Sequence, residues 1–476
     1  MGTVKTEVVV LGSGPGGYAA AFYAADMGKE VVLIEQDPQL GGVCLNRGCI
    51  PSKALLHAAE VVNEAAEAKD MGIAFDKPKI DLTKLGQWKT GILKKLSGGV
   101  EGLAKKRGVK VIYGRGHFES STRLRVETAK GQQFVEYDKC ILAVGSKPAL
   151  PGIFDLGNKR IMTSTEALQL AEIPKKLLIV GAGYIGMELG VVYSSLGSKV
   201  VMVEALSGVL TGADRDLARP VQKYTEKHFE ELRLNTKVTK TATHKKQIKV
   251  NMSVDGKDKE ELYDAVLVSV GRVPNSKDLG LENTSVKQDE KGFVQVNAQQ
   301  QTDDANIFAI GDIAGGLLLA HKASKEARIA VENILGEPST FKDVLVPAVV
   351  FTSPEVAWVG LTEEEAKSKQ IEFKVAKFPW GASGRAMTMN KPDGLTKLVV
   401  DPKTDRILGV GIVGAHAGDL IGEGALAIEM GANVKDIAET LHPHPTLSET
   451  YMEAAEAFYG VATHIYAHKK NLEKVR

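Results

Sequence analysis

The sequence is poor in cysteine and has no long apolar run. Three cysteines among 476 residues are too few for the disulfide scaffold of a small secreted domain. No apolar run approaches the roughly 18 residues that a membrane-spanning helix needs, and a strand-like segment at 8–11 comes too early for a signal peptide. We therefore expect a soluble chain that is not exported.

An excess of one charge is also missing. Sixty basic residues against fifty-nine acidic ones leave a formal net charge of +1, so no overall field attracts nucleic acid or an anionic membrane. Hydrophobic residues make up 43% of the chain, which suffices for several buried cores, and the length corresponds to about three domains. The expected class is a multidomain globular protein.

What the chain does contain is an internal repeat. A shift of 169 positions superimposes residues 8–35 on residues 177–204 without a gap. Each copy has a short apolar run, G-x-G-x-x-G, a stretch of helical length and a second apolar run that ends in glutamate, which predicts strand, turn, helix and strand. The matched residues are Gly12 and Gly181, Gly14 and Gly183, Gly17 and Gly186, Gly28 and Gly197, Val31 and Val200, Val32 and Val201, and Glu35 and Glu204.

This repeat predicts two dinucleotide sites. The first glycine of the motif allows a tight turn, the second lets the backbone approach a pyrophosphate, and the third permits close helix packing, while the helix N-terminus offers N–H groups to phosphate. Glu35 and Glu204 can accept hydrogen bonds from ribose hydroxyls. One such motif is explained equally well as turn chemistry, but two in matching contexts are strong evidence.

A second echo relates the ends of the two units. At an offset of 126, both copies close an apolar run with the same pattern, which predicts the same kind of strand and loop. Cys140 falls opposite Val266 inside this run, so we expect a buried core thiol without chemistry. The matched positions are Tyr137-Asp138 and Tyr263-Asp264, Gly145 and Gly271, and Pro148 and Pro274.

The segments after the second copy contain no further glycine-rich phosphate loop. An apolar run at 308–310 ends in Gly311-Asp312 before a predicted helix from Ala320, so Asp312 either meets a phosphate or sugar hydroxyl or caps that helix. From Pro347 the chain alternates β-type segments around two predicted helices. We expect an α/β fold with domains at 1–148, 149–273, 274–346 and 347–476, and an insertion at 80–130 that holds a helix and β-rich segments.

Cys44 and Cys49 call for a redox explanation. A bridge over so short a loop would stabilise the fold by only about 2 kcal/mol, a poor structural use in a chain without other disulfides. Pro51 suits the first turn of a helix, which places Cys49 at a positive helix end, and Lys53 adds charge that stabilises a thiolate. No second Cys/His pair with ligand spacing accompanies the cysteines, so we expect no metal.

Two dinucleotide sites and a dithiol together form an electron path from dithiol to flavin to nicotinamide. Cys44 follows Glu35 by nine residues, so the first unit is predicted to bind FAD and the second NAD(P). No arginine follows Glu204 until Arg215, and Glu204 would repel a 2′-phosphate, which favours NAD over NADP.

A thiol substrate also needs a base whose pKa lies near neutrality. His442 and His444 alternate with prolines, which implies a rigid loop, and Glu449 lies close enough in sequence to orient His444 and stabilise its imidazolium. Spacing alone leaves both histidines as candidates.

These motifs resemble those of the pyridine nucleotide-disulfide oxidoreductases, and among them the dihydrolipoyl dehydrogenases, over essentially the whole chain. The similarity rests on Gly42-x-Cys44-x₄-Cys49-Ile50-Pro51-Ser52-Lys53, the paired glycine motifs, Gly311-Asp312 and His442-Pro443-His444-Pro445-Thr446-Leu447-Ser448-Glu449. It implies two Rossmann-like domains, for FAD and NAD, a central region and a C-terminal α+β interface domain that forms a homodimer.

The resemblance also implies residue roles. Cys44 would exchange with the substrate thiol and Cys49 would lie against the flavin. Lys53 and Glu188 would pair near the flavin and nicotinamide rings. His444, oriented by Glu449, would serve the other subunit's disulfide. The FAD residues would be Gly12, Gly14, Gly17, Glu35, Lys53, Gly145, Gly311 and Asp312, and the NAD residues Gly181, Gly183, Gly186, Glu204 and Gly271.

The implied reaction is oxidation of dihydrolipoamide with NAD⁺. The implied partners are lipoyl domains of 2-oxo acid dehydrogenase acyltransferases or the glycine cleavage H protein, in a bacterial cytoplasm or, after processing, a mitochondrial matrix. Glutathione and trypanothione reductases remain alternatives, although basic residues for NADPH are missing after Glu204. Mercuric and large thioredoxin reductases need a further C-terminal cysteine pair, and this chain has no cysteine after Cys140. Soluble transhydrogenases of this family lack an intact cysteine pair, which this chain has. A non-enzymatic binding module would retain the fold without turnover.

Overall fold

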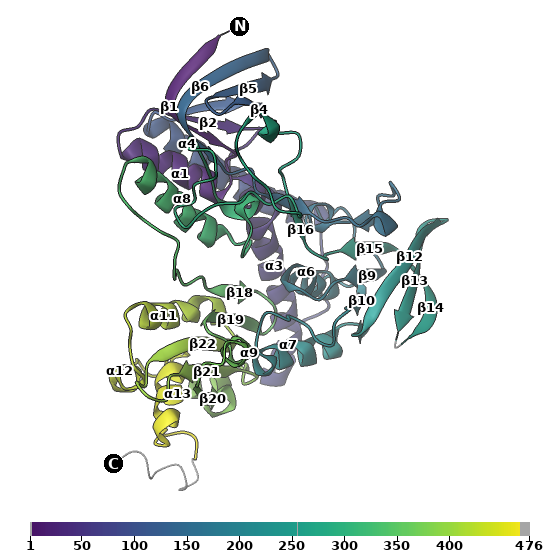
Figure 1. Ribbon diagram of the computed structural model, residues 1–476. Helices are drawn as coiled ribbons and strands as arrows, with labels where there is room; N and C mark the ends of the chain where they lie inside the picture. Colours follow the sequence, from purple (N-terminus) through teal and green to yellow (C-terminus); the bar gives the residue numbers. More distant parts are fainter. Residues whose placement is uncertain (1, 255, 467–476) are drawn as a thin grey trace.

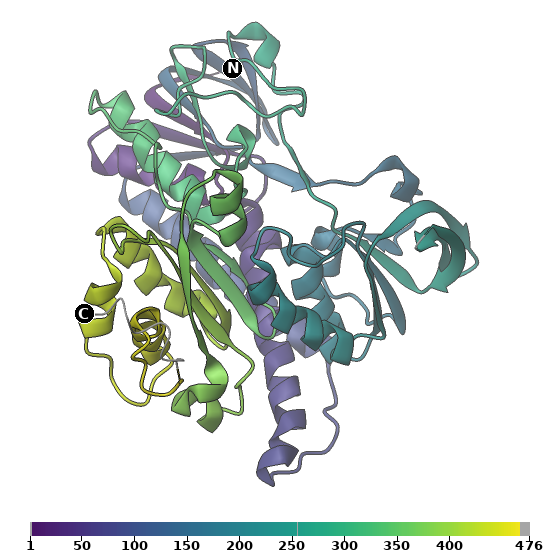
Figure 2. The same ribbon diagram turned by 60° about the horizontal axis from the view of Figure 1, so that its bottom comes forward.

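The computed structural model describes residues 2–254 and 256–466, which form three bodies around helix α3 (Cys49–Glu67) (Figure 1). Figure 2 shows α3 running down between the C-terminal body and the second body. In the described part of the chain, no helix is both long and apolar enough to cross a membrane.

The first body is built on one mixed sheet with the strand order β3-β2-β1-β6-β5-β4 and β17 beside β6. The long strand β6 belongs to two arrangements: its first half pairs antiparallel with β5, residues from Phe134 onward pair parallel with β1, and its last three residues pair parallel with β17. The strands are β1 (Thr3–Leu11), β2 (Val31–Glu35), β3 (Lys110–Tyr113), β4 (Arg115–Ser120), β5 (Arg123–Thr128), β6 (Gly131–Leu142) and β17 (Ile307–Ala309).

The central parts of the parallel strands, at 8–11, 31–34 and 140–142, are continuous buried apolar runs because both faces of the sheet are covered there. Small side chains of α1 (Pro15–Asp26), among them Ala20 and Ala24, pack with Ala327 of α8 (Ala320–Ile334) on one face. Cys140 is fully buried in β6, as expected, and burial raises the pKa of its thiol.

The predicted insertion at 80–130 is only partly an insertion. It begins with α4 (Leu82–Lys106), but β3 then joins the parallel sheet beside β2, while β4 and β5 form an antiparallel meander with β6. The edge strand β3 was missed because its four residues give too short a pattern for a period to be read.

The second body repeats the first, as the sequence predicted. Its parallel strands have the order β11-β10-β9-β15-β8, so β11-β10-β9-β15 corresponds to β3-β2-β1-β6, and a separate meander β12-β13-β14 accompanies them. The elements are α5 (Ser164–Ala167), α6 (Tyr184–Ser195), α7 (Arg215–His228), β8 (Ile161–Met162), β9 (Lys176–Val180), β10 (Lys199–Val203), β11 (Glu231–Arg233), β12 (Thr236–His244), β13 (Gln247–Val254), β14 (Lys257–Tyr263) and β15 (Ala265–Val268).

Two strands connect the first and second bodies. The segments related by the offset of 126 form β7 (Ser146–Pro148) and β16 (Arg272–Pro274), and they pair with each other antiparallel. The echo in the sequence therefore marks both chain crossings between the bodies.

The C-terminal body is an antiparallel sheet with the order β18-β19-β22-β21-β20. Alternate residues face two cores. Val356 and Val413 pack with α7 and α3, whereas Ala357 and Ile412 pack with α11 (Ala417–Glu429) and α13 (Glu449–Tyr459). The strands are β18 (Ala348–Val350), β19 (Glu355–Gly360), β20 (Lys374–Pro379), β21 (Leu395–Val400) and β22 (Ile407–Gly414).

The prediction of two helices after Pro347 is incomplete, because the described residues contain five α-helices there. Only α11 and α13 exceed six residues, and helices of five or six residues are too short to show a helical period. The five are α9 (Glu363–Ser368), α10 (Gly384–Thr388), α11 (Ala417–Glu429), α12 (Val434–Glu439) and α13 (Glu449–Tyr459).

Candidate active site

The two glycine-rich turns have the same steric requirements. Gly12 and Gly181 adopt φ of 101° and 102°, which L side chains rarely adopt. A Cβ on Gly17 would lie 1.8 Å from the carbonyl oxygen of Gly12, and one on Gly186 would lie 2.1 Å from that of Gly181. The first and third glycines of each motif are therefore required by the fold of the turn.

The middle glycines meet no such neighbour. Gly14 and Gly183 are the N-caps of α1 and α6, and a Cβ on either would meet no atom within 4 Å. Open space thus lies directly in front of each helix N-terminus, where phosphate is stabilised by unpaired N–H groups.

The two terminal glutamates accept equivalent hydrogen bonds. Glu35 accepts from the backbone N–H groups of Ser13 at 2.9 Å and Asp37 at 2.8 Å. Glu204 accepts from Ala182 at 2.7 Å and Leu206 at 2.9 Å. Each carboxylate is therefore fixed beside its glycine turn, at the position expected for contact with a ribose.

A cavity of about 1010 Å³ opens beside the first turn and extends to the second body. Tyr184 and Glu188 of α6 reach it, whereas the predicted NAD residues on the second turn do not line it. These residues fit FAD, because the carboxylate of Glu35, the first glycine turn and the two cysteines all line the same cavity. Among the predicted residues, the lining includes Gly12, Gly14, Glu35, Cys44, Cys49, Lys53, Gly145, Glu188, Gly311 and Asp312.

Asp312 lies in this cavity and does not cap α8, whose N-cap is Leu319. Its carboxylate accepts a hydrogen bond from Ser146 and lies 3.6 Å from Nε of Arg272. Arg272 in turn donates to the Ser146 hydroxyl at 2.7 Å. Sequence reasoning missed Ser146 and Arg272, although Arg272 directly follows Gly271 within the second echo.

The two cysteines belong to two consecutive helices. Cys44 belongs to α2 (Gly42–Arg47), and Cys49 is the first residue of α3. Gly42 has φ of 58°, and a Cβ there would lie 2.5 Å from Cα of Gly14. The absence of that Cβ lets α2 approach the glycine turn, so the cysteines lie next to the predicted phosphate site.

Both cysteines are free thiols in this structure and share a hydrogen bond. The bond from Cys44, and then the charge of Lys53, lower the pKa of Cys49 to about 7 against the effect of burial. The same bond and burial raise the pKa of Cys44. Of the two, Cys49 is therefore the group that carries the thiolate at neutral pH.

Lys53 and Glu188 form the expected ion pair, with Nζ–O distances of 2.8 and 3.0 Å. Glu188 is almost fully buried, and it also accepts from the hydroxyl of Ser52 at 2.9 Å and the backbone N–H of Phe351 at 3.1 Å. Lys53 lies 4.4 Å from the centre of the Phe351 ring. Residues from all three bodies therefore meet at the Lys53–Glu188 ion pair beside the cavity.

The two candidate histidines have different environments. Nδ1 of His444 donates to the carboxylate of Glu449 at 2.8 Å, and the side chain of His444 is 72% exposed. His442 is 5% exposed and uses both ring nitrogens, on Glu423 at 2.8 Å and on the carbonyl of Thr440 at 2.9 Å. Of these two candidates, only His444 has an accessible ring nitrogen, which supports it as the acid/base.

Replacing His442 with alanine is expected to lower the free energy of unfolding by about 2 kcal/mol, since the two hydrogen bonds of a largely buried side chain are lost. Turnover of the folded enzyme should largely remain. His444→Ala should show the reverse pattern. Thermal unfolding and steady-state rates of both variants check this, and loss of turnover in a folded His442→Ala would contradict the choice of His444.

The structure does not bring His444 to the cysteines of its own chain. Leu447 and Tyr451, which flank Glu449, pack on the face of the C-terminal sheet that carries α11 and α13. Leu55 of α3 packs in the core on the opposite face. The sheet therefore lies between the histidine and its own dithiol, and His444 does not line the cavity.

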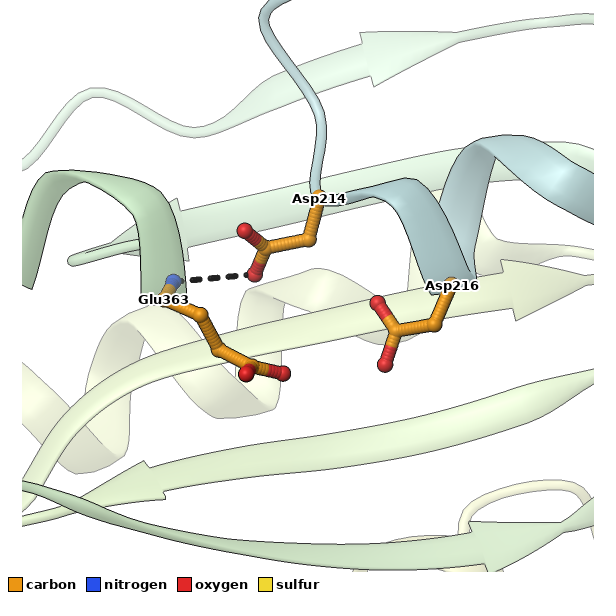
Figure 3. A group of neighbouring side chains, drawn as sticks. All are labelled: Asp214, Asp216 and Glu363. Atoms are coloured by element: carbon orange, nitrogen blue, oxygen red, sulfur yellow. Dashed lines mark hydrogen bonds between the residues drawn. The ribbon is translucent and has the colours of Figure 1, made fainter. Parts of the chain in front are cut away.

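One acidic cluster could be mistaken for a metal site. Asp214, Asp216 and Glu363 lie together (Figure 3), but Nζ of the buried Lys397 is 2.6, 2.7 and 3.1 Å from their oxygens. Lys377 adds a second ammonium 2.7 Å from Asp216. The cluster is an ion-pair network that ties α7 to the C-terminal body.

Comparison with known proteins agrees with this geometry. Residues 6–327 match the pyridine nucleotide-disulphide oxidoreductase family, and residues 346–455 match its dimerisation domain. The chain belongs to this family.

Curated relatives extend over the whole chain. A dihydrolipoyl dehydrogenase of Vibrio parahaemolyticus is 47% identical over 474 residues, which is 99% of both proteins. One from Thermus scotoductus is 46% identical over 466 residues, 96% of this chain and 98% of that protein.

Solved structures share the fold. LpdA from Mycobacterium tuberculosis has a TM-score of 0.88 at 29% identity and covers 95% of this chain and 99% of its own. The HOCl-induced flavoprotein disulfide reductase RclA from Escherichia coli has a TM-score of 0.84 at 29% identity, with 94% and 98% covered.

Membership of this oxidoreductase family brings the cofactors FAD and NAD. The dimerisation domain supports a homodimer, in which a second chain can supply the histidine that the cavity lacks. The individual residue roles and the boundaries at 148, 273 and 346 remain predictions.

Proposed function

We propose that the protein oxidises protein-bound dihydrolipoamide to lipoamide and reduces NAD⁺, with the Cys44–Cys49 pair as the redox centre. The observation that carries this proposal is the Cys44–Cys49 pair in the lining of a cavity suited to FAD. The full-length relatives named above are dihydrolipoyl dehydrogenases.

The residues act in sequence on the oxidised pair. His444 of a second subunit accepts a proton from one substrate thiol, and the resulting sulfur attacks Cys44. The Cys44–Cys49 bond breaks, and Cys49 leaves as a thiolate that Lys53 stabilises. The second substrate sulfur then displaces Cys44, so the substrate loses two electrons and two protons and the enzyme holds a dithiol.

FAD, when bound, would supply a two-electron acceptor for the dithiol and a hydride donor for NAD⁺. The chain's own part is to hold the reacting groups. Gly14, Glu35 and Asp312 would bind the FAD phosphates and sugar portions, and Lys53 with Glu188 would place a fixed charge pair where α3 meets α6.

The physiological substrate would be a lipoyl group on a lipoyl domain of a 2-oxo acid dehydrogenase acyltransferase or on a glycine cleavage H protein. The relatives named above come from bacteria, which supports a place in the bacterial cytoplasm.

An anaerobic absorbance titration tests the proposal. Dihydrolipoamide should reduce the enzyme by two electrons, and NAD⁺ should then restore the oxidised flavin spectrum. Glutathione with NADP⁺ serves as the parallel arm for the glutathione-reductase alternative. Reduction by glutathione but not by dihydrolipoamide would overturn the proposed substrate.

Glu204→Ala is expected to weaken NAD⁺ binding by about 1–3 kcal/mol, because a charged acceptor for the ribose is lost, and to narrow the preference for NAD⁺ over NADP⁺. FAD content should stay full. The matched variant Glu35→Ala should lose FAD instead. The kcat/KM values for both nucleotides check this, and a wild-type preference for NADP⁺ would show that the role of Glu204 is wrong.

A further inference from the structure

A second imidazole–carboxylate pair lies one helical turn beyond the first. After α13 the chain reverses at Gly460, which has φ of 73°, and returns along the helix. Nδ1 of His464 hydrogen-bonds Oε1 of Glu453, and its backbone N–H donates to Oε2 of the same carboxylate at 3.4 Å. The side chain of Glu453 is only 4% exposed.

The two pairs share one face of α13. Glu449, Glu453 and Glu456 are spaced by four and three residues, so their side chains lie side by side. Like charges at this spacing repel one another. Burial and then the neighbouring Glu453 raise the pKa of Glu456. A positive charge near this face would therefore stabilise its carboxylates in their anionic form.

Electrostatics link His464 to the first pair. The hydrogen bond from Glu453 raises the pKa of His464, with smaller effects from Glu449 and Glu456. Burial alone would raise the pKa of Glu449, but the N–H of Thr446, then His444, and then His464 lower it overall.

The other elements packed against α13 carry charge at its far end. Asp436 and Glu439 of α12 act on Tyr459, and Lys374 of β20 lies over the ring of Phe458.

We propose that His464 is a positioning residue for the acid/base pair, and that its positive charge balances Glu453 so that Glu449 stays anionic and oriented toward His444. The inference rests on the proposed function. When the charge of Glu453 is balanced by His464, Glu449 is the carboxylate on this face that acts on His444. Without the charge of His464, both His444 and Glu449 would bind protons more readily.

The test is the pH profile of kcat/KM for dihydrolipoamide. His444 must be neutral to accept a proton, so activity rises with pH through its ionisation. His464→Gln keeps a donor for Glu453 but removes the charge, and we expect the rise to move upward by about half a pH unit or more. His464→Arg should restore the wild-type midpoint.

The double variant Glu453→Gln/His464→Gln removes both charges and should also return the midpoint toward that of the wild type. His244→Gln, in the distant strand β12, is the matched control and should leave the profile unchanged. FAD content and thermal midpoint confirm that each variant is folded. If His464→Gln fails to fold, the double variant Glu453→Gln/His464→Arg leaves an unbalanced positive charge, and the midpoint should then move downward.

A loss of activity without a shift of the midpoint, or a shift that neither second variant reverses, would overturn the proposal. Reduction of ferricyanide by NADH needs no thiol base and should not change in any variant. An inactive wild type with dihydrolipoamide would refute the proposed function, whereas an active wild type with unshifted variants would refute only the role of His464.

Discussion

Replacing Cys49 with serine is expected to lower dihydrolipoamide oxidation by roughly four orders of magnitude while FAD stays bound. Serine cannot form a disulfide with Cys44, so the substrate has no sulfur–sulfur bond to attack. The oxygen of serine also ionises far above neutral pH, whereas the pKa of Cys49 is about 7. Steady-state turnover and the flavin spectrum measure both parts of the prediction.

Cys140→Ser is the matched control for this variant. Cys140 is fully buried in β6 and does not line the cavity that contains Cys44 and Cys49. Its replacement should therefore affect stability more than turnover. Normal turnover in Cys49→Ser would refute the dithiol as the redox centre. A Cys140→Ser variant that folds with full FAD but is inactive would show that the wrong thiol was assigned.

Mixing inactive Cys44→Ser dimers with inactive His444→Gln dimers is expected to create activity. A hybrid dimer pairs the intact Cys44 of one chain with the intact His444 of the other, so one of its two sites is complete. Random exchange makes half of the dimers hybrid, so activity should rise to roughly a quarter of that of the wild type.

The physical reason is the placement of His444 on the opposite face of the C-terminal sheet from α3. Native mass spectrometry follows the exchange, and activity is measured in the same samples. If hybrids form but activity does not rise, the histidine acts within its own chain and the shared site is wrong.

Much of the fold could be predicted from the sequence because its signals are local. The repeat is read from glycines at positions where a Cβ would lie only 1.8 or 2.1 Å from a carbonyl oxygen of the turn. Cys44 and Cys49 are close in sequence and belong to two consecutive helices, so a short motif contains most of the chemistry of that site.

Other features could not be predicted because they depend on contacts between bodies. Glu188 is held by Ser52 and Phe351, which are 136 and 163 residues away in the sequence. No periodicity reports such contacts. Spacing alone does not decide between His442 and His444. The resemblance favours His444, and the fold adds the physical difference, since the side chain of His442 is buried and that of His444 is exposed.

The paired strands β7 and β16 restrict how the nucleotide bodies can move. A single connecting segment would act as a free pivot, but two strands joined by backbone hydrogen bonds resist twisting and bending between the units they connect. Arg272 strengthens this join by bonding Ser146 on the opposite strand. We therefore expect the distance between the two glycine turns to stay nearly constant during turnover, so that admission of the nicotinamide depends on side-chain rearrangement at the cavity mouth and not on closure of one body over the other.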